Sequence, residues 1–213
     1  MKFTVMDCEQ RSIEWYAARA GRLTGSVAGA MMTKIKSGEA AARRDLRLSL
    51  ALARITGIPE ESDYVSKEMQ RGIDLEPVAL GEYEIATGVI VQRTGFLSCD
   101  GIMAGCSLDG HINNFEGIVE YKCPKSATHY KYLRDGVLPS EHRQQCMHNL
   151  WVSGAKWCDF VSFDDRFPEH LQLFIVRMER DESAIKEYEA EAMRFLAEVA
   201  IDVKEISELR KAA

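Results

Sequence analysis

Two carboxylates and one lysine stand close together in a stretch of the sequence that resembles a β-hairpin. Glu120 and Lys122 alternate with apolar residues in the strand-like segment 119–123, so their side chains should lie on one face. Asp109 precedes a loop, 111–117, that can close a hairpin onto this segment. The three side chains would then converge at one edge of a sheet. Such a set can bind a hard divalent cation and activate water beside it, which predicts hydrolysis of a phosphodiester by a nuclease.

This chemistry gives each residue a role. We expect Asp109 and Glu120 to bind Mg²⁺, for which Mn²⁺ can substitute, with the backbone carbonyl of Tyr121 as a third oxygen. Lys122 would orient or deprotonate the attacking water and offset charge in the transition state, and a neighbouring cation would lower its pKa. The alternative for so short a pattern is a solvated strand face. The apolar surroundings and Pro124, which ends the segment, favour a site.

Two helical segments carry polar residues with two interpretations each. Glu76 lies in a helical pattern beside Pro77, and it belongs either to the site or to the helix surface. Gln145 and Asn149 are four residues apart on one helix face. Their amides could position water or a phosphate oxygen, or they could form an ordinary polar face. Spacing does not decide between these interpretations.

A phosphate-binding pattern lies nearer the N-terminus. Arg19 is followed by the hydroxyl groups of Thr24 and Ser26 at the start of a predicted helix. A helix N-terminus offers free N–H groups and a favourable dipole, and arginine pairs well with phosphate oxygens. Ordinary capping by Thr24 explains the same residues equally well.

Composition limits the class of protein. The chain has 213 residues, of which 46% are hydrophobic, enough for a sizeable core in one domain. No apolar run approaches a membrane span of ~20 residues, and the N-terminus has no secretory apolar region. Six cysteines without a C-x-x-C pair indicate reduced thiols rather than a zinc ribbon. The net charge of −6 is mildly against DNA binding, but segment 34–54 gathers basic residues as either a positive patch or a solvated helix face.

Periodicity and breaker residues predict an α/β fold: an N-terminal helical layer (about 12–87), a central mixed sheet (about 88–178) and a C-terminal helix (about 181–210), all in one domain over 1–213. Pro77 should kink or split its helix. We expect helices at 13–20, 25–36, 39–56, 66–87, after 124, at 141–151 and at 181–209, and strands at 89–91, 96–97, 102–103, 118–121, 157–163 and 171–178.

Four sequence patterns together resemble the lambda exonuclease/YqaJ-like viral recombinase family of the PD-(D/E)XK nuclease superfamily, over about residues 15–163. They are R-x-x-x-x-T-x-S from Arg19, G-x-x-x-E ending at Glu76, C-S-L-D-G at 106–110 and E-Y-K-C-P at 120–124, followed by a helix with Gln145 and Trp151. Leu108 stands where the family usually has proline, which should loosen the backbone before Asp109 without moving it.

The resemblance implies a PD-(D/E)XK nuclease-like fold, a central mixed β-sheet flanked by helices. It also implies a Mg²⁺-dependent exonuclease that degrades one strand of linear duplex DNA from its 5′ end and leaves a 3′ overhang for a single-strand annealing protein. Glu76 would support the metal site and Gln145 the active site, while Arg19, Thr24, Ser26 and Ser107 would hold the 5′-phosphate. A homotrimer, a phage or prophage origin and the cytoplasm of a bacterial host are further implications, with no membrane partner.

Two other functions stay open. An endonuclease of the same fold would use Asp109, Glu120 and Lys122 without needing a 5′-phosphate pocket, and it would nick closed circular DNA. A catalytically idle module that binds DNA ends would bind without cleavage. The intact pair of carboxylates speaks against the idle module, because a binding fold has no need of two acids at close range.

Overall fold

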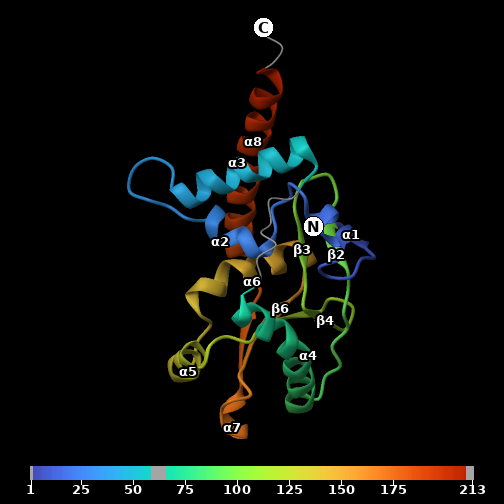
Figure 1. The fold of residues 1–213 in the computed structure, drawn as a ribbon, viewed down its shortest axis with the longest axis vertical. Coiled ribbons are helices and arrows are strands. Elements are labelled where there is room, and N and C mark those ends of the chain that lie inside the picture. Colours follow the sequence, from blue (N-terminus) through green and yellow to red (C-terminus); the bar gives the residue numbers. More distant parts are fainter. Residues whose placement is uncertain (1, 59–65, 210–213) are drawn as a thin grey trace.

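The structure is a computed structural model that describes residues 2–58 and 66–209 (Figure 1). The predictions that extend to residues 1 and 210–213 therefore lie partly outside the described residues. The helices are α1 (Ile13–Arg19), the 3₁₀ helix η1 (Gly25–Val27), α2 (Ala28–Met31), α3 (Ala41–Thr56), α4 (Lys67–Thr87), α5 (Ser126–Asp135), α6 (Ser140–Ser153), α7 (Glu169–Gln172) and α8 (Glu182–Glu208). The strands are β1 (Phe3–Met6), β2 (Phe96–Cys99), β3 (Gly105–Ser107), β4 (Gly110–Ile112), β5 (Gly117–Lys122), β6 (Trp157–Phe163) and β7 (Leu173–Glu179).

The strands form two sheets. Strands β1, β2 and β3 pair antiparallel in that order. The second sheet has the order β4-β5-β6-β7, in which β5 and β6 run parallel and the other pairs antiparallel. The predicted α/β class with a mixed sheet flanked by helices is therefore confirmed, and the smaller antiparallel sheet is an addition to it.

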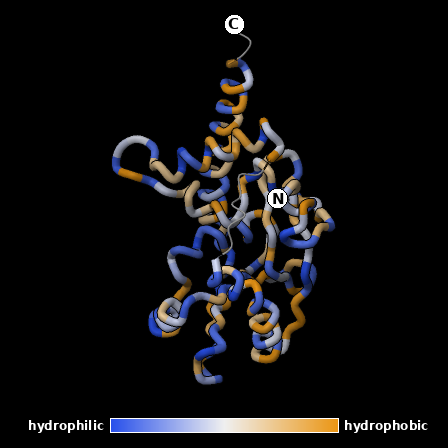
Figure 2. The backbone as a smooth tube through the Cα atoms, viewed as in Figure 1, coloured by the Kyte–Doolittle hydropathy of each residue, from blue (hydrophilic) through white to orange (hydrophobic). Residues whose placement is uncertain are grey.

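Helix α6 is the central element of the packing. Every residue from Cys146 to Ser153 is buried, and the helix contacts β2, β3, β5, β6 and α8. Helix α8 buries one face, including Tyr188 and Phe195, and apolar and polar turns alternate along it in the hydropathy view (Figure 2). Asp181 caps this helix by accepting hydrogen bonds from the first-turn N–H groups. The helix that supplies Gln145 and Asn149 is thus fixed from both sides.

Several predicted elements differ in the structure. The helix predicted at 25–36 is instead the short η1 and α2, and it ends at Met31. Segments 89–91 and 102–103 form no strand; instead Gln92 makes a single bridge to His111, and the Met103 carbonyl accepts from the Leu23 N–H. Strand β1 was not predicted. Pro77 lies inside α4 and does not split it.

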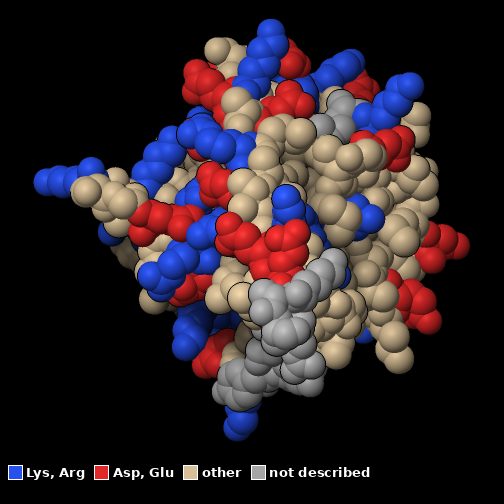
Figure 3. All heavy atoms as spheres, turned by 90° about the horizontal axis from the view of Figure 1, so that it is seen from above, with Lys and Arg blue, Asp and Glu red and all other residues tan. Residues whose placement is uncertain are grey.

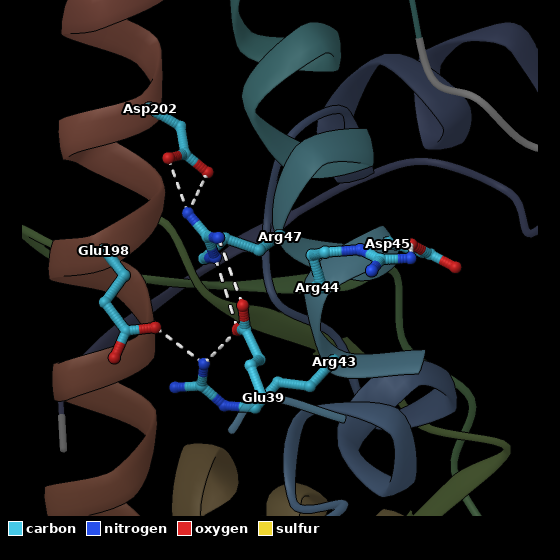
Figure 4. Close-up of polar contacts among 7 residues, drawn as sticks. All are labelled: Glu39, Arg43, Arg44, Asp45, Arg47, Glu198 and Asp202. Atoms are coloured by element: carbon cyan, nitrogen blue, oxygen red, sulfur yellow. Dashed lines mark hydrogen bonds and ion pairs between the residues drawn. The ribbon is translucent and has the colours of Figure 1, made fainter. Parts of the chain in front are cut away.

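The basic stretch at 34–54 pairs with acids rather than standing as a patch (Figure 4). Arg43 contacts Glu198 at 2.6 Å and Arg47 contacts Asp202, so α3 is tied to α8 where the two helices cross. Glu39 accepts from both arginines. Seen from the α8 end, basic and acidic side chains are interspersed over the surface (Figure 3). The predicted alternatives were a positive patch and a solvated helix face, and the structure instead pairs Arg43 and Arg47 with acids between two helices.

None of the helices in the described part of the chain is both long enough and apolar enough to cross a membrane.

Candidate active site

The predicted hairpin positions the first carboxylate. Strand β4 pairs antiparallel with β5 in the register Gly110 to Val119, which sets Asp109 opposite Glu120. The Asp109 carboxylate accepts a hydrogen bond from the Tyr121 backbone N–H at 2.8 Å. This bond fixes Asp109 at the end of the strand although Leu108, rather than proline, precedes it. The hairpin and the convergence that the sequence predicts are both present.

Glu120 is the most deeply buried acid of the site, with 1% of its surface exposed. Its carboxylate accepts hydrogen bonds from the Lys122 ammonium and from the Gln145 amide, and from the Asn149 amide at 3.0 Å. Glu120 and Lys122 therefore do point to the same face of β5, as strand alternation predicts. The ring of Tyr121, on the opposite face, packs edge-on against Tyr83. Gln145 and Asn149 thus direct their amides at Glu120, and any role in positioning water or a phosphate oxygen stays a prediction.

Burial and mutual repulsion shape the electrostatics of these groups. Burial raises the pKa of Glu120 to about 7, and the neighbouring Asp109 and Glu76 add to this rise while Lys122 opposes it. Burial likewise raises the pKa of Asp109 above its ordinary value. Burial alone would lower the pKa of Lys122, but attraction to Glu120 and Asp109 outweighs it and raises that pKa. Lys122 and the more distant arginines therefore offset burial and mutual repulsion only in part, and the carboxyl groups keep raised pKa values.

Glu76 reaches the same place from α4. Its side chain is 19% exposed and lies 3.8 Å from the guanidinium groups of both Arg11 and Arg93. Burial and the charge of Asp109 raise the pKa of Glu76. Glu76 lines two clefts, one of about 590 Å³ that also holds Lys122 and one of about 350 Å³ that also holds Asp109. Of its two sequence interpretations, the structure supports the site rather than the helix surface.

The predicted phosphate-binding residues also meet. The guanidinium of Arg19 donates to the hydroxyls of Ser107 at 3.4 Å and Ser26 at 3.3 Å. The hydroxyls of Thr24 and Ser26 lie 3.2 Å apart. Trp15, which the sequence did not single out, donates its indole N–H to Ser107 at 2.8 Å, and Arg19 stacks on its ring at 4.1 Å. Because Ser26 is exposed and Arg19 half-buried, an anion can approach this cluster from solvent.

Gly25 connects the phosphate cluster to the carboxylates. A Cβ atom on Gly25 would lie 2.5 Å from the side-chain oxygen of Asn149 and 3.4 Å from the Cγ of Gln145. Both of these residues donate to Glu120. The close approach that only glycine permits therefore lets the turn carrying Thr24 and Ser26 rest directly on the Glu120 support.

The donor set suits a hard divalent cation. Asp109, Glu120 and Glu76 supply carboxylate oxygens, the ligands that Mg²⁺ prefers. A cation among them would offset the burial and the repulsion that raise their pKa values. Across residues 2–58 and 66–209, however, no three His, Cys, Asp or Glu side chains are already gathered closely enough to hold a metal ion. The residues fit such an ion by chemistry, and the ion itself stays a proposal.

Several residues of the site were not predicted from the sequence. Arg11, Arg93 and Trp15 reach it through contacts between distant segments, which local spacing does not reveal. Arg11 has a backbone φ of 70°, which residues other than glycine rarely adopt. This strained conformation is visible in the structure, but no feature of the sequence predicts it.

Comparison with known proteins follows this geometry. The model of the YqaJ-like viral recombinase domain matches residues 14–156. A structure of LHK-Exo in complex with dAMP is 38% identical, with a TM-score of 0.86 over 95% of this chain and 100% of that one. A structure of an alkaline exonuclease (LHK-Exo) from Laribacter hongkongensis is also 38% identical, with a TM-score of 0.84 over 94% of this chain and 98% of that one.

A more distant structure shares the fold. A phage related exonuclease from Haemophilus somnus 129PT is 14% identical, with a TM-score of 0.67 over 87% of this chain and 96% of that one. No curated protein matches the chain. The family match and the alkaline exonuclease structures support a nuclease role. The match over residues 14–156 shows that this chain belongs to the YqaJ-like viral recombinase family.

Proposed function

We propose that the protein is a metal-dependent exonuclease that degrades one strand of linear duplex DNA from its 5′ end and leaves a 3′ overhang. The observation that carries this proposal is the contact of Gly25 with Asn149 and Gln145. Both of these residues donate to Glu120, so the contact sets the Arg19 cluster (Arg19, Thr24, Ser26 and Ser107) close to the Glu120 carboxylate. A terminal phosphate and a scissile phosphodiester could then be held at once. That arrangement supports an enzyme that measures from a strand end.

Each side chain has a task in this proposal. Arg19, Ser26 and Ser107 bind the 5′-phosphate through charge-assisted hydrogen bonds, with Thr24 orienting Ser26. Gln145 and Asn149 fix the orientation of Glu120, so that its rotamer is set before substrate arrives. Lys122 orients the attacking water and offers its charge to the phosphoryl oxygens in the transition state.

The cation completes the chemistry. Asp109 and Glu120, supported by Glu76 and the backbone carbonyl of Tyr121, would hold Mg²⁺, with Mn²⁺ as a substitute. When bound, the ion would lower the pKa of a water molecule and stabilise the negative charge at the scissile phosphate. Binding at these carboxylates would also weaken the attraction that keeps the Lys122 ammonium protonated.

Family analogy supports the wider setting of this proposal. We propose a homotrimer, a single-strand annealing protein as partner, and a phage or prophage protein working in the cytoplasm of a bacterial host. An endonuclease of the same fold is the second candidate, because it shares Asp109, Glu120 and Lys122. The Arg19 cluster favours the exonuclease, since cutting within a strand needs no terminal phosphate.

The test compares the rate of degradation of linear duplexes with 5′-phosphate and with 5′-hydroxyl ends, for the wild type and Arg19→Ala. We expect the wild type to prefer the phosphorylated end and Arg19→Ala to lose that preference, with a loss of about 10-fold or more on the phosphorylated substrate alone. Arg44→Ala is the control, because Arg44 is exposed and pairs only with its neighbour Asp45. Equal losses on both substrates would remove Arg19 from end recognition, and cutting of closed circles would favour the endonuclease.

A further inference from the structure

The larger cleft is positively charged although the chain as a whole is acidic. Five lysines or arginines line it against two glutamates, whereas the net charge of the chain is −6. Lys122 and Glu76 line this cleft, so it includes two of the proposed catalytic groups. Lys125 on this wall is paired with Glu68 at 3.2 Å. Arg11 lies 3.8 Å from Glu76, and the other two basic residues are Arg71 from α4 and Arg166 from the turn after β6.

Both arginines are held by one buried carboxylate, Asp164. Its side chain is 0% exposed, and it accepts from Arg71 at 2.9 Å and from Arg166 at 2.7 and 2.8 Å. Burial alone would raise the pKa of Asp164, but hydrogen bonds from Arg166 and Ser126 hold that pKa well below its usual range. The Asp164 carboxylate therefore brings together two segments 93 residues apart through its bonds to both arginines.

The two guanidinium groups keep nitrogen atoms that bond no described residue. Arg71 uses only its Nη2 atom, on Asp164 and Asp165, and Arg166 uses Nε and Nη2, on Asp164 and the Pro124 carbonyl. No described residue accepts from the Nη1 atom of either arginine. The side chains are 28% and 47% exposed. A guanidinium anchored on one edge and free on the other can bind a phosphate oxygen with little loss of rotamer freedom.

We propose that Arg71 and Arg166 form a phosphate-binding pair for the backbone of a DNA strand in the larger cleft, and that Asp164 is the residue that positions both. The identity of the strand rests on the proposed function. The pair lies apart from the Arg19 cluster, because Arg19, Ser26 and Ser107 do not line this cleft. It contacts an internal phosphodiester rather than the 5′-phosphate, so it acts on every duplex whatever its end.

The alternative is a structural ion pair, and salt dependence separates the two. Each Lys or Arg that neutralises a phosphate releases counterions, so losing one contact lowers the slope of log affinity against log salt by about 1. A purely structural arginine changes the melting temperature and leaves this slope unchanged. The test measures equilibrium binding of a blunt duplex with Ca²⁺ in place of Mg²⁺ over a series of salt concentrations.

We expect Arg166→Ala and Arg71→Ala each to reduce the slope by about 1 and to weaken binding roughly 3- to 10-fold, equally for 5′-phosphate and 5′-hydroxyl ends. Asp164→Asn should weaken binding although it touches no DNA, and should raise KM far more than it lowers kcat. Arg44→Ala should leave slope and KM unchanged. A wild-type slope in Arg166→Ala, the more exposed and structurally safer variant, would overturn the proposal.

The outcome is distinguishable from failure of the exonuclease. If the wild type does not cut DNA but Arg71→Ala and Arg166→Ala both reduce the salt slope, the phosphate-binding pair stands and the proposed reaction fails. If the wild type cuts from 5′ ends but both variants keep the wild-type slope, the reaction stands and the pair fails. A loss confined to 5′-phosphorylated ends would also overturn the proposal, because it would assign these arginines to the end.

Discussion

The α3–α8 crossing and the candidate active site both join carboxylates to basic groups, but they balance charge in opposite ways. At the crossing, burial would raise the pKa of Glu39, yet its bonds to Arg47 and Arg43 lower that pKa below its usual value. In the site, burial and like charges raise the pKa of Glu76 and Glu120. The three acids at the crossing share the guanidinium groups of Arg43 and Arg47 in close ion pairs. In the site, Glu120 pairs with Lys122, while Glu76 lies 3.8 Å from its nearest guanidinium groups and is repelled by Asp109.

This difference in charge balance distinguishes a structural cluster, the α3–α8 crossing, from a functional one, the candidate active site. In ion pairs that join two helices each charge is compensated by its partner and needs no ligand, and removing one partner is destabilising because it leaves the other charge uncompensated. Like charges gathered in a partly buried site destabilise the native state until a cation or substrate offsets them, and such local conflicts are typical of functional sites. The comparison predicts that substitutions at the crossing change stability alone, and that substitutions in the site change activity first.

The largest expected effect is the loss of cleavage in Lys122→Ala. We expect the rate on linear duplex DNA to fall by about 10³-fold or more, because the water loses its orienting group and the transition state loses a charge. Lys125→Ala is the matched control, since Lys125 lines the same cleft but is 69% exposed and paired with Glu68. Circular dichroism checks the fold of both variants. Full-rate cleavage by Lys122→Ala would remove the lysine from the mechanism.

The next effect tests the contact between the phosphate cluster and the carboxylates. In Gly25→Ala the new methyl group meets the Asn149 oxygen at 2.5 Å, so Asn149 must shift away from Glu120. We expect cleavage to fall by about 10- to 100-fold, the cost of a small misplacement. Gly29→Ala, four residues further along, meets nothing within 4 Å and should keep wild-type activity. Equal activities of the two variants would contradict a tight contact here.

At the crossing we expect a change of stability without a change of activity. Arg47→Ala removes the partner of Asp202 and leaves Glu39 with Arg43 alone, so it should lower the free energy of unfolding by about 1–3 kcal/mol. Arg44→Ala on the same helix, exposed and paired only with Asp45, should cost less than about 0.5 kcal/mol. Urea titration measures both. Loss of DNA cleavage in folded Arg47→Ala would mean that the crossing also contributes to the site.

The smallest effect is a pH dependence of opposite sign in the two regions. Because the pKa of Glu39 is lowered in the folded state, its contribution is present above its ordinary value of 4.5 and is lost as pH falls below it. Because the pKa of Glu120 is raised to about 7, metal-free stability falls as pH rises from about 4.5 to about 7.

Two variants measure these opposite signs. The destabilisation by Arg47→Ala should shrink below about pH 4. Asp109→Asn keeps an acceptor for the Tyr121 N–H and removes a like charge, so it should be relatively more stable at pH 8 than at pH 5, by roughly 1 kcal/mol. Unfolding in the presence of a chelator at both pH values measures each variant against the wild type. The same pH trend in both variants would erase the distinction between the two regions.

Sequence reasoning succeeded where a pattern is local. Strand alternation in 119–123 gave the shared face of Glu120 and Lys122, and helical spacing gave the buried face of α8. The resemblance to a family assigned Arg19 and Ser107 to one phosphate pocket, and the two side chains are hydrogen-bonded in the structure. Local spacing also explains the misleading signals: Ile90 resembles a strand residue, yet it is 80% exposed in a segment whose single pairing is one bridge at Gln92.

Sequence reasoning missed what depends on distant contacts. Asp164 holds Arg71 across 93 residues, and Trp15 reaches Ser107 across 92. No spacing rule links such positions, because only the packed fold sets them side by side. The basic stretch at 34–54 was ambiguous for the same reason, since its acidic partners Glu198 and Asp202 lie at the other end of the chain.

The central claim is that Asp109, Glu120 and Lys122 hydrolyse a strand held by its 5′ end, and one digestion tests it most directly. A linear duplex carrying different labels at its 5′ and 3′ ends is incubated with Mg²⁺ beside a closed circular duplex, for wild type and Lys122→Ala. We predict early release of the 5′ label, retention of the 3′ label, intact circles and no release by Lys122→Ala. Earlier release of the 3′ label, or cutting of circles, would contradict the account.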